Sequence, residues 1–403
     1  MGYQPKFAPK GPKKPSVWFI LLGILIVPLS LMLTGKLLLF FYNNAGHSKT
    51  DAPGRAQSIQ VAQKVDDHVA QRLAGARAAI SSDEDLQAPP ETIPPPRVIY
   101  TIDETAPAGP KPNPDCYGET TDPAVLEEVL EKAKYLLGEQ TMCFDPNRTR
   151  FEEDPAVRYY LDDSILAVTW KEVHDESVYT FSEIKVAHPS QFRRHLAGGV
   201  YGGDIQYLPT EMAPSVNAVV ASSGDFYRFR DFGVVVYEGK VRKVNGTYAE
   251  TCMIDRSGDL HFVYPGQITT TEAAQQYADE NDIWFSLAFG PILVDNGQPV
   301  DHDWYGVGEI NDTYARAALC QMDELHYLVA TANTESPHFK IPTVEMFRNN
   351  IQATGCKMAY CLDGGQTATI VMMDQLVNRP VYGQQRKMSD ILYFATAIPE
   401  GAE

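Results

Sequence analysis

The chain has 403 residues, of which 44% are apolar, and its formal net charge at pH 7 is −18 with a pI near 4.9. This length and composition can supply a substantial core, and the acidic balance argues against a nucleic-acid partner, whose phosphate backbone attracts basic surfaces. Six cysteines are too few for a disulfide scaffold in a chain of this size.

The N-terminal residues have the pattern of a membrane anchor. Residues 1–16 carry lysines and no acidic side chain, and the apolar run VWFILLGILIVPLSLMLT (17–34) follows and continues past Lys36 to Tyr42. At a rise of about 1.5 Å per residue, a helix over 17–42 can cross a bilayer. Basic charge before the span predicts a cytoplasmic tail at 1–16 and an extracellular location for the rest of the chain. A cleaved secretion signal is the alternative.

Residues 43–115 are predicted to hold the remaining chain away from the membrane. Apolar residues recur at helical spacing within 56–80, which predicts a stalk helix capable of self-association. Residues 81–115 are acidic and then rich in proline, with PPETIPPP and PAGPKPNP, a composition typical of an extended linker.

A helical lead-in is predicted for 116–154. In TTDPAVLEEVLEKAKYLLGEQ, Asp122 is a helix cap, Pro123 favours the first turn and Gly138 ends the helix. Cys116 and Cys143 lie on either side of it, and outside the membrane they could form a disulfide or remain unpaired.

The region 155–403 reads as an α+β domain, with a mixed β-sheet and flanking helices. Two helices are predicted, a short one in HPSQFRRHLAGG and a longer one in PTVEMFRNNIQATG with Met346 and Ile351 inward. Strands are predicted in VRYYLDDSILAVTWKEV, SVYTFSEIKVA, NAVVASSG, FGVVVYEGKVRKV, LHFVYP, WFSLAFGPILVDNG, ARAALCQMDELHYLVATA and MAYCLDGG.

Asp363-Gly364-Gly365 interrupts an apolar stretch in GCKMAYCLDGGQTATIVMMD. One interpretation is a hairpin turn, because Asp-Gly is a strong hairpin signal. The other is a turn that presents a carboxylate and bare backbone amides to an anionic ligand, with the Thr367 hydroxyl beside them.

A second apolar strand is broken at Ser222-Ser223-Gly224-Asp225, and the aromatic residues Phe226 and Tyr227 follow. A carboxylate beside aromatic rings suits a sugar, although a simple turn explains the same pattern. Arg316, at the start of a predicted strand, can grip a phosphate or carboxylate or form a surface ion pair. Asn378 and Arg386 are further candidates for polar contacts.

Other chemistries lack their motifs. Asp301 and His302 have no partner motif for a metal site, and Cys356 and Cys361 lack the second pair of a zinc site. There is no G-x-S-x-G nucleophile elbow and no P-loop.

Taken in order, five segments of residues 155–398 resemble the phosphodiester glycosidase family, which includes the mannose 6-phosphate uncovering enzyme and many bacterial exopolysaccharide-biosynthesis-like proteins. SSGDFYRFRDFGVVVYEGK resembles the family's N-G-D-Y-Y strand end and hairpin, and SLAFGPILVDNGQPV resembles SFGPxLVxNG. ARAALCQ, CLDGGQT and RKMSDILYFATA resemble R-T-A-I-G-Q, L-D-G-G-G-S and R-x-V-S-D-x-x-Y. The chain departs from the family at Ser223, Gln366 and Thr367, and it lacks an Asp-Gly-Arg triplet after YLVATANTESP.

The resemblance implies hydrolysis of a sugar-1-phosphodiester, such as a GlcNAc-1-phosphodiester, in cell-envelope polysaccharide metabolism. Asp363, Asp225 and Arg316 are the expected catalytic residues. No cofactor is expected, and a bound divalent cation such as calcium is left open. The anchor indicates a single-pass protein of a bacterial cell membrane, and the departures leave a catalytically inactive glycan-binding or envelope-assembly protein as the alternative. Substrate contacts are expected from Ser223, Gly224, Phe226, Tyr227, Gly364, Gly365, Thr367, Asn378 and Arg386.

Overall fold

The computed structural model describes residues 98–302, 305, 312–333, 335 and 338–399. The predicted tail, anchor and stalk helix lie outside these ranges. Within them, no helix is long and apolar enough to cross a membrane. The elements described below all belong to one unit of the chain, Pro95–Glu403.

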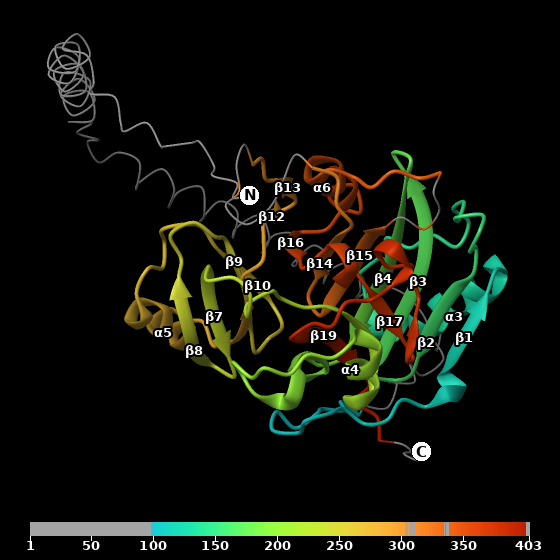
Figure 1. The fold of residues 1–403 in the computed structure, drawn as a ribbon. Coiled ribbons are helices and arrows are strands. Elements are labelled where there is room, and N and C mark those ends of the chain that lie inside the picture. Colours follow the sequence, from blue (N-terminus) through green and yellow to red (C-terminus); the bar gives the residue numbers. More distant parts are fainter. Residues whose placement is uncertain (1–97, 303–304, 306–311, 334, 336–337, 400–403) are drawn as a thin grey trace, which may run out of the picture. The chain divides into compact units, whose positions relative to one another are not determined.

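Three antiparallel sheets form the framework (Figure 1). The nine-stranded sheet contains β1 (Tyr117–Thr120), β2 (Val157–Leu161), β3 (Ile165–His174), β4 (Ser177–Val186), β12 (Ile292–Asp295), β13 (Gln298–Pro299), β14 (Arg316–Asp323), β15 (His326–Asn333) and β16 (Met358–Leu362). Its strand order is β1-β2-β3-β4-β15-β14-β16-β12-β13.

The other two sheets have five strands each. The first, called the β7 sheet here, has the order β10-β9-β11-β7-β8 and consists of β7 (Gly233–Tyr237), β8 (Lys240–Asn245), β9 (Thr251–Asp255), β10 (Leu260–Val263) and β11 (Ile283–Leu287). The second, the β6 sheet, has the order β18-β17-β6-β19-β5 and consists of β5 (Phe192–Leu196), β6 (Ala218–Ser223), β17 (Ile370–Met372), β18 (Gln375–Leu376) and β19 (Asp390–Ala395).

All three sheets bury one face in a shared core, and helices cover their other faces. The alternation along β14 shows the principle, because Ala317 and Leu319 lie in the shared core whereas Ala318 and Cys320 face the helical side. The helices are α3 (Pro123–Leu137) and α6 (Val344–Gln352) on the nine-stranded sheet, α4 (Pro209–Ser215) on the β6 sheet and α5 (Thr271–Glu280) on the β7 sheet. The predicted α+β class is confirmed, and the strand pairs are antiparallel rather than mixed.

The signals at the ends of α3 act as predicted. The Asp122 side chain accepts a hydrogen bond from the amide of Ala124 at 2.9 Å, Pro123 opens the helix, and Gly138 follows it with a positive φ of 61°. In α6, Ile351 is buried as predicted, but Phe347 takes the inward position that was expected of Met346.

The helix predicted in HPSQFRRHLAGG is wrong. A 3-10 turn over Pro189–Gln191 leads into β5, whose residues Phe192, Arg194 and Leu196 alternate inward. The strand forms because β5 pairs with β19, from a segment almost two hundred residues later in the chain. Tertiary pairing therefore overrides the local helical pattern.

Residues 98–115, assigned from sequence to the linker, run along the domain. The Ile102 side chain is buried and its amide donates to Ser190 Oγ at 2.9 Å, while the amide of Asn113 donates to the Tyr160 hydroxyl at 3.1 Å. Cys116 and Cys143 are free thiols, and Cys143 contacts Glu183 instead.

Candidate active site

The Asp363-Gly364-Gly365 segment is a crossover between two sheets. It leaves β16 in the nine-stranded sheet, forms a 3-10 turn over Gly365–Thr367 and enters β17 in the β6 sheet. Because β16 and β17 do not pair with each other, the hairpin interpretation of this segment is wrong.

The interruption after β6 is a second crossover. The chain leaves the β6 sheet after Ser223 and enters the β7 sheet at Gly233. The two crossovers touch, since the amide of Asp363 donates to the carbonyl oxygen of Gly224 at 3.2 Å. Segments far apart in the chain therefore meet at one junction of sheets.

Arg316 reaches the same junction because of strand register. β14 pairs antiparallel with β16 so that Ala317 lies opposite Leu362, and Arg316 and Asp363 each follow one step beyond that pair. The chain passes very close here, and a Cβ on Gly364 would lie 2.5 Å from the carbonyl oxygen of Ala315. The amide of Gly365 donates to that same oxygen at 2.8 Å, so it is not available to an anion.

A cavity of about 190 Å³ opens at this junction. Its volume is below the roughly 300–1,000 Å³ of pockets for drug-sized ligands and suits one small polar group or ring. Six of the residues predicted from sequence line it: Phe226, Arg316, Asp363, Gly364, Gly365 and Arg386. The other lining residues are Arg230, Phe289, Gly290, Pro291, Tyr305, Tyr314, Ala315, Val344, Cys361 and Leu362.

Asp363 is the carboxylate among the described lining residues, and its environment makes it easier to protonate than an ordinary aspartate. The side chain is 9% exposed, and burial raises its pKa to about 6 from the ordinary 3.8. Arg386 opposes that rise, because its Nη2 donates to Asp363 Oδ2 at 2.9 Å, and the charge of Arg230 opposes it further. A carboxyl group with a pKa near neutrality can exchange a proton with substrate or water at physiological pH.

Three guanidinium groups line the cavity together with that carboxylate. Arg316 is mostly buried and donates to the carbonyl oxygen of Asp312 at 2.9 Å, whereas the side chain of Arg386 is 45% exposed at the cavity's edge. Arg230 lies between aromatic faces, 4.3 Å from the ring centre of Phe289 and 5.4 Å from that of Phe226. With one carboxylate and three arginines, the described lining carries a net positive charge that suits an anionic group.

Sequence reasoning missed Arg230. It stands in the irregular segment FYRFRD after β6, where no periodicity indicates which side chain faces a ligand. Its neighbour Arg228 looks equivalent in sequence but turns to Asp204 and the carbonyl oxygen of Gly203. The only indication in the sequence was the cluster of aromatic and basic residues in this segment, which does not single out Arg230.

Several predicted residues lie outside the cavity lining. Asp225 is 3% exposed, and its carboxylate oxygens accept hydrogen bonds from the amides of Phe226 at 2.7 Å and Ala288 at 2.9 Å. Asn378 is buried and holds the chain near β17, accepting from the amide of Ile370 at 2.7 Å. Ser223, Gly224, Tyr227 and Thr367 are also buried and absent from the lining.

The structure gives His302 a partner other than a metal. Its Nε2 lies 2.9 Å from Glu250 Oε1, and Tyr305, which lines the cavity, contacts the amide of Glu250 through its hydroxyl. Asp301 pairs with Arg348. Within the described ranges, no group of three or more His, Cys, Asp or Glu side chains could hold a metal ion.

Comparison with known proteins agrees with the sequence motifs. Residues 216–395 match the model of the phosphodiester glycosidase family. Among solved structures, the chain is similar to the catalytic domain of zebrafish N-acetylglucosamine-1-phosphodiester alpha-N-acetylglucosaminidase, auto-inhibited by its pro-peptide. The two share 17% identity and a TM-score of 0.46 over 58% of this chain and 83% of that one.

It is also similar to a hypothetical protein from Synechocystis, with 12% identity and a TM-score of 0.41 over 59% of this chain and 63% of that one. No curated protein matches the chain. The matched range contains all the predicted site residues. Residues 216–395 therefore match a phosphodiester glycosidase domain, the hydrolase family that the sequence motifs resemble.

Proposed function

We propose that the protein hydrolyses a sugar-1-phosphodiester, such as a GlcNAc-1-phosphodiester, outside a bacterial cell membrane to which its N-terminal segment anchors it. The observation that carries the proposal is the junction cavity, whose lining combines Asp363, three arginines and aromatic rings within the family-matched range. The anionic phosphate meets the guanidinium groups, and the apolar face of a sugar meets Phe226 or Phe289. The anchor is supported by the sequence of residues 1–42.

The reaction breaks the bond between the anomeric carbon and the phosphate oxygen. The phosphate leaves with the electron pair as a phosphomonoester, and a water oxygen forms the new bond to the anomeric carbon. Because a phosphomonoester is a good leaving group, charge stabilisation by Arg316, Arg386 and Arg230 is the main requirement on that side. Asp363, in its ionised form, accepts the proton from the attacking water or stabilises the positive charge that develops on the sugar.

The alternative proposal is an inactive glycan-binding or envelope-assembly protein. The departures from the family pattern motivate it, but Ser223, Gln366 and Thr367 do not line the cavity. Thr367 still provides a hydroxyl that lowers the pKa of Asp363, and the lining holds this carboxylate together with three guanidinium groups, which favours the enzyme.

The test is to incubate the full-length protein, in detergent, with GlcNAc-1-phosphodiesters and UDP-GlcNAc and to measure the released sugar. Hydrolysis that Asp363→Asn abolishes supports the proposal. If no sugar is released and a glycan array shows binding, the alternative is correct. Full turnover by the Asp363→Asn variant would remove this carboxylate from the reaction.

A further inference from the structure

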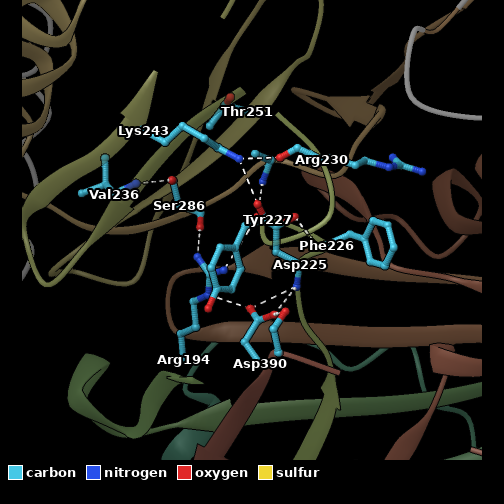
Figure 2. Close-up of polar contacts among 12 residues, drawn as sticks. Arg194, Asp225, Phe226, Tyr227, Arg230, Val236, Lys243, Thr251, Ser286 and Asp390 are labelled. Atoms are coloured by element: carbon cyan, nitrogen blue, oxygen red, sulfur yellow. Dashed lines mark hydrogen bonds and ion pairs between the residues drawn. The ribbon is translucent and has the colours of Figure 1, made fainter. Parts of the chain in front are cut away.

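The segment 225–230 has no regular secondary structure of its own, yet it carries Phe226 and Arg230 into the cavity. A segment without a strand ladder depends on other groups to fix its backbone. The structure shows charged side chains bound to both of its ends, buried ones at the first end and the half-buried Lys243 at the second (Figure 2).

The first end is fixed by Asp390 and Arg194. Asp390 lies opposite Gly224 across the β6–β19 pair, and its carboxylate oxygens accept from the amide of Asp225 at 3.1 and 3.2 Å. Arg194 donates through Nε to Asp390 Oδ2 at 2.8 Å. Both side chains are at most 1% exposed, so this ion pair has almost no contact with water.

Arg194 also ties this end to the β7 sheet. Its Nη1 donates to the carbonyl oxygen of Ser286 in β11, and Asp225 accepts from the amide of Ala288 just beyond that strand. Although burial opposes the charged form, Asp390 and Asp225 hold the pKa of Arg194 above its ordinary value. The two carboxylates and the guanidinium therefore join the β6 and β7 sheets at the root of the segment.

The second end is fixed by Lys243 in β8. Its ammonium group donates to the carbonyl oxygens of Tyr227 at 2.9 Å and of Arg230 at 2.5 Å. Figure 2 shows the Arg230 side chain extending away from Lys243, on the same side of the segment as the Phe226 ring. The backbone of Arg230 is thus held from behind while its guanidinium group faces the cavity.

Arg230 is half-buried, and one nitrogen of its guanidinium group has no hydrogen-bond acceptor among the described residues. Its Nη1 is shielded from solvent and makes no hydrogen bond to any residue in the described ranges. Burial lowers the pKa of Arg230, while the charges of Asp363 and Asp225 act in the opposite direction. A buried donor without an acceptor is costly, and a phosphate oxygen is a strong acceptor for it.

We propose that Arg230 is a phosphate-binding residue of the cavity, and that Asp225, Arg194, Asp390 and Lys243 are positioning residues that hold it there. In this assignment Asp225 acts on the substrate only through the segment it begins. The identification of the anion as the phosphate of a sugar-1-phosphodiester rests on the proposed function.

Inorganic phosphate is the probe, because its affinity can be measured by calorimetry without any hydrolysis. The full-length protein is compared with Arg230→Ala and with the matched control Arg228→Ala, whose guanidinium binds Asp204 instead. Loss of a charge-assisted hydrogen bond typically costs ten-fold or more in affinity, so we expect Arg230→Ala to weaken phosphate binding by roughly ten-fold or more and Arg228→Ala to leave it unchanged. Equal affinity in Arg230→Ala and wild type overturns the proposal.

The positioning role is tested by a double-mutant cycle. Asp225→Asn is expected to weaken phosphate binding in the wild-type background but not in the Arg230→Ala background, because it acts through Arg230. Independent losses that multiply in the double variant would refute the positioning role, as would an Asp225→Asn variant that binds phosphate normally and loses only turnover. If Asp225→Asn does not fold, Lys243→Met replaces it in the cycle, since that ammonium group holds the other end of the segment.

The two proposals fail separately. Phosphate affinity that depends on Arg230, in a protein that hydrolyses no sugar-1-phosphodiester, supports the phosphate site and refutes the proposed reaction. Hydrolysis by a protein whose phosphate affinity is unaffected by Arg230→Ala supports the proposed reaction and refutes the phosphate site.

Discussion

Replacing Asp363 by asparagine should remove activity and also stabilise the folded protein at neutral and alkaline pH. The carboxyl pKa is about 6 in the folded state, compared with 3.8 ordinarily. At about 1.36 kcal/mol per pKa unit, ionising this buried group costs the folded state about 3 kcal/mol once the pH is well above 6. Asparagine has the same shape and no charge, so Asp363→Asn should recover up to about 3 kcal/mol of unfolding free energy at pH 8.

The sign of this effect depends on pH. Because the folded-state pKa is the higher one, the folded protein binds the proton more tightly, and this contribution to stability is complete below pH 3.8 and lost as the pH rises through about 6. The gain from Asp363→Asn should therefore be absent near pH 4 and grow between pH 4 and pH 7.

Urea unfolding of the purified protein in detergent, followed by fluorescence from pH 4 to pH 8, measures the effect. Asp115→Asn is the matched control, because Asp115 is exposed and its substitution should change the unfolding free energy little at any pH. A variant that is less stable than wild type at pH 8, or equally stabilised at pH 4 and pH 8, would show that the burial of an ionised carboxylate is not what sets the behaviour of Asp363.

Three further predictions concern the cavity and the crossover beside it. Arg386→Gln removes a charge that lowers the pKa of Asp363, so the acid limb of the kcat/KM profile, expected near pH 6 in wild type, should move to higher pH; an unmoved limb would assign it to another group. Gly224→Ala would place a Cβ 2.5 Å from Asp390 Oδ2 and should destabilise the protein by about 1–3 kcal/mol in urea unfolding, whereas the control Gly203→Ala, with its nearest neighbour at 3.4 Å, should not. Incubation with EDTA should leave hydrolysis unchanged, because arginines supply the charge stabilisation; lost turnover that calcium restores would contradict this.

The sequence was most informative where strands end. Asp363 directly follows the apolar strand β16, and Arg316 is the first residue of the apolar strand β14. This local pattern pointed to both residues as lining one site, because the antiparallel register places the end of one strand beside the start of the other. Long strands such as β3 and β4 were predicted, since their apolar runs are strong and both of their faces are buried, whereas β1, β9 and β19 were not among the predicted strands.

The sequence was least informative where a side chain's direction depends on distant partners. Asp225 and Arg230 stand in the same irregular segment, and only the contacts of Asp225 with Ala288 and of its amide with Asp390 turn its carboxylate away from the cavity lining. The strand β5 was missed for the same reason, because its partner β19 lies far along the chain. Neither outcome has a local signature that periodicity could detect.

The hydrogen bond from the Asp363 amide to the Gly224 carbonyl joins the two crossovers through main-chain atoms alone. A related protein could therefore replace almost every side chain that lines the cavity and still keep the two crossovers in contact, since no side chain takes part in this hydrogen bond. Slow hydrogen–deuterium exchange at this single amide would thus indicate that a divergent or engineered relative has kept the contact between the two crossovers.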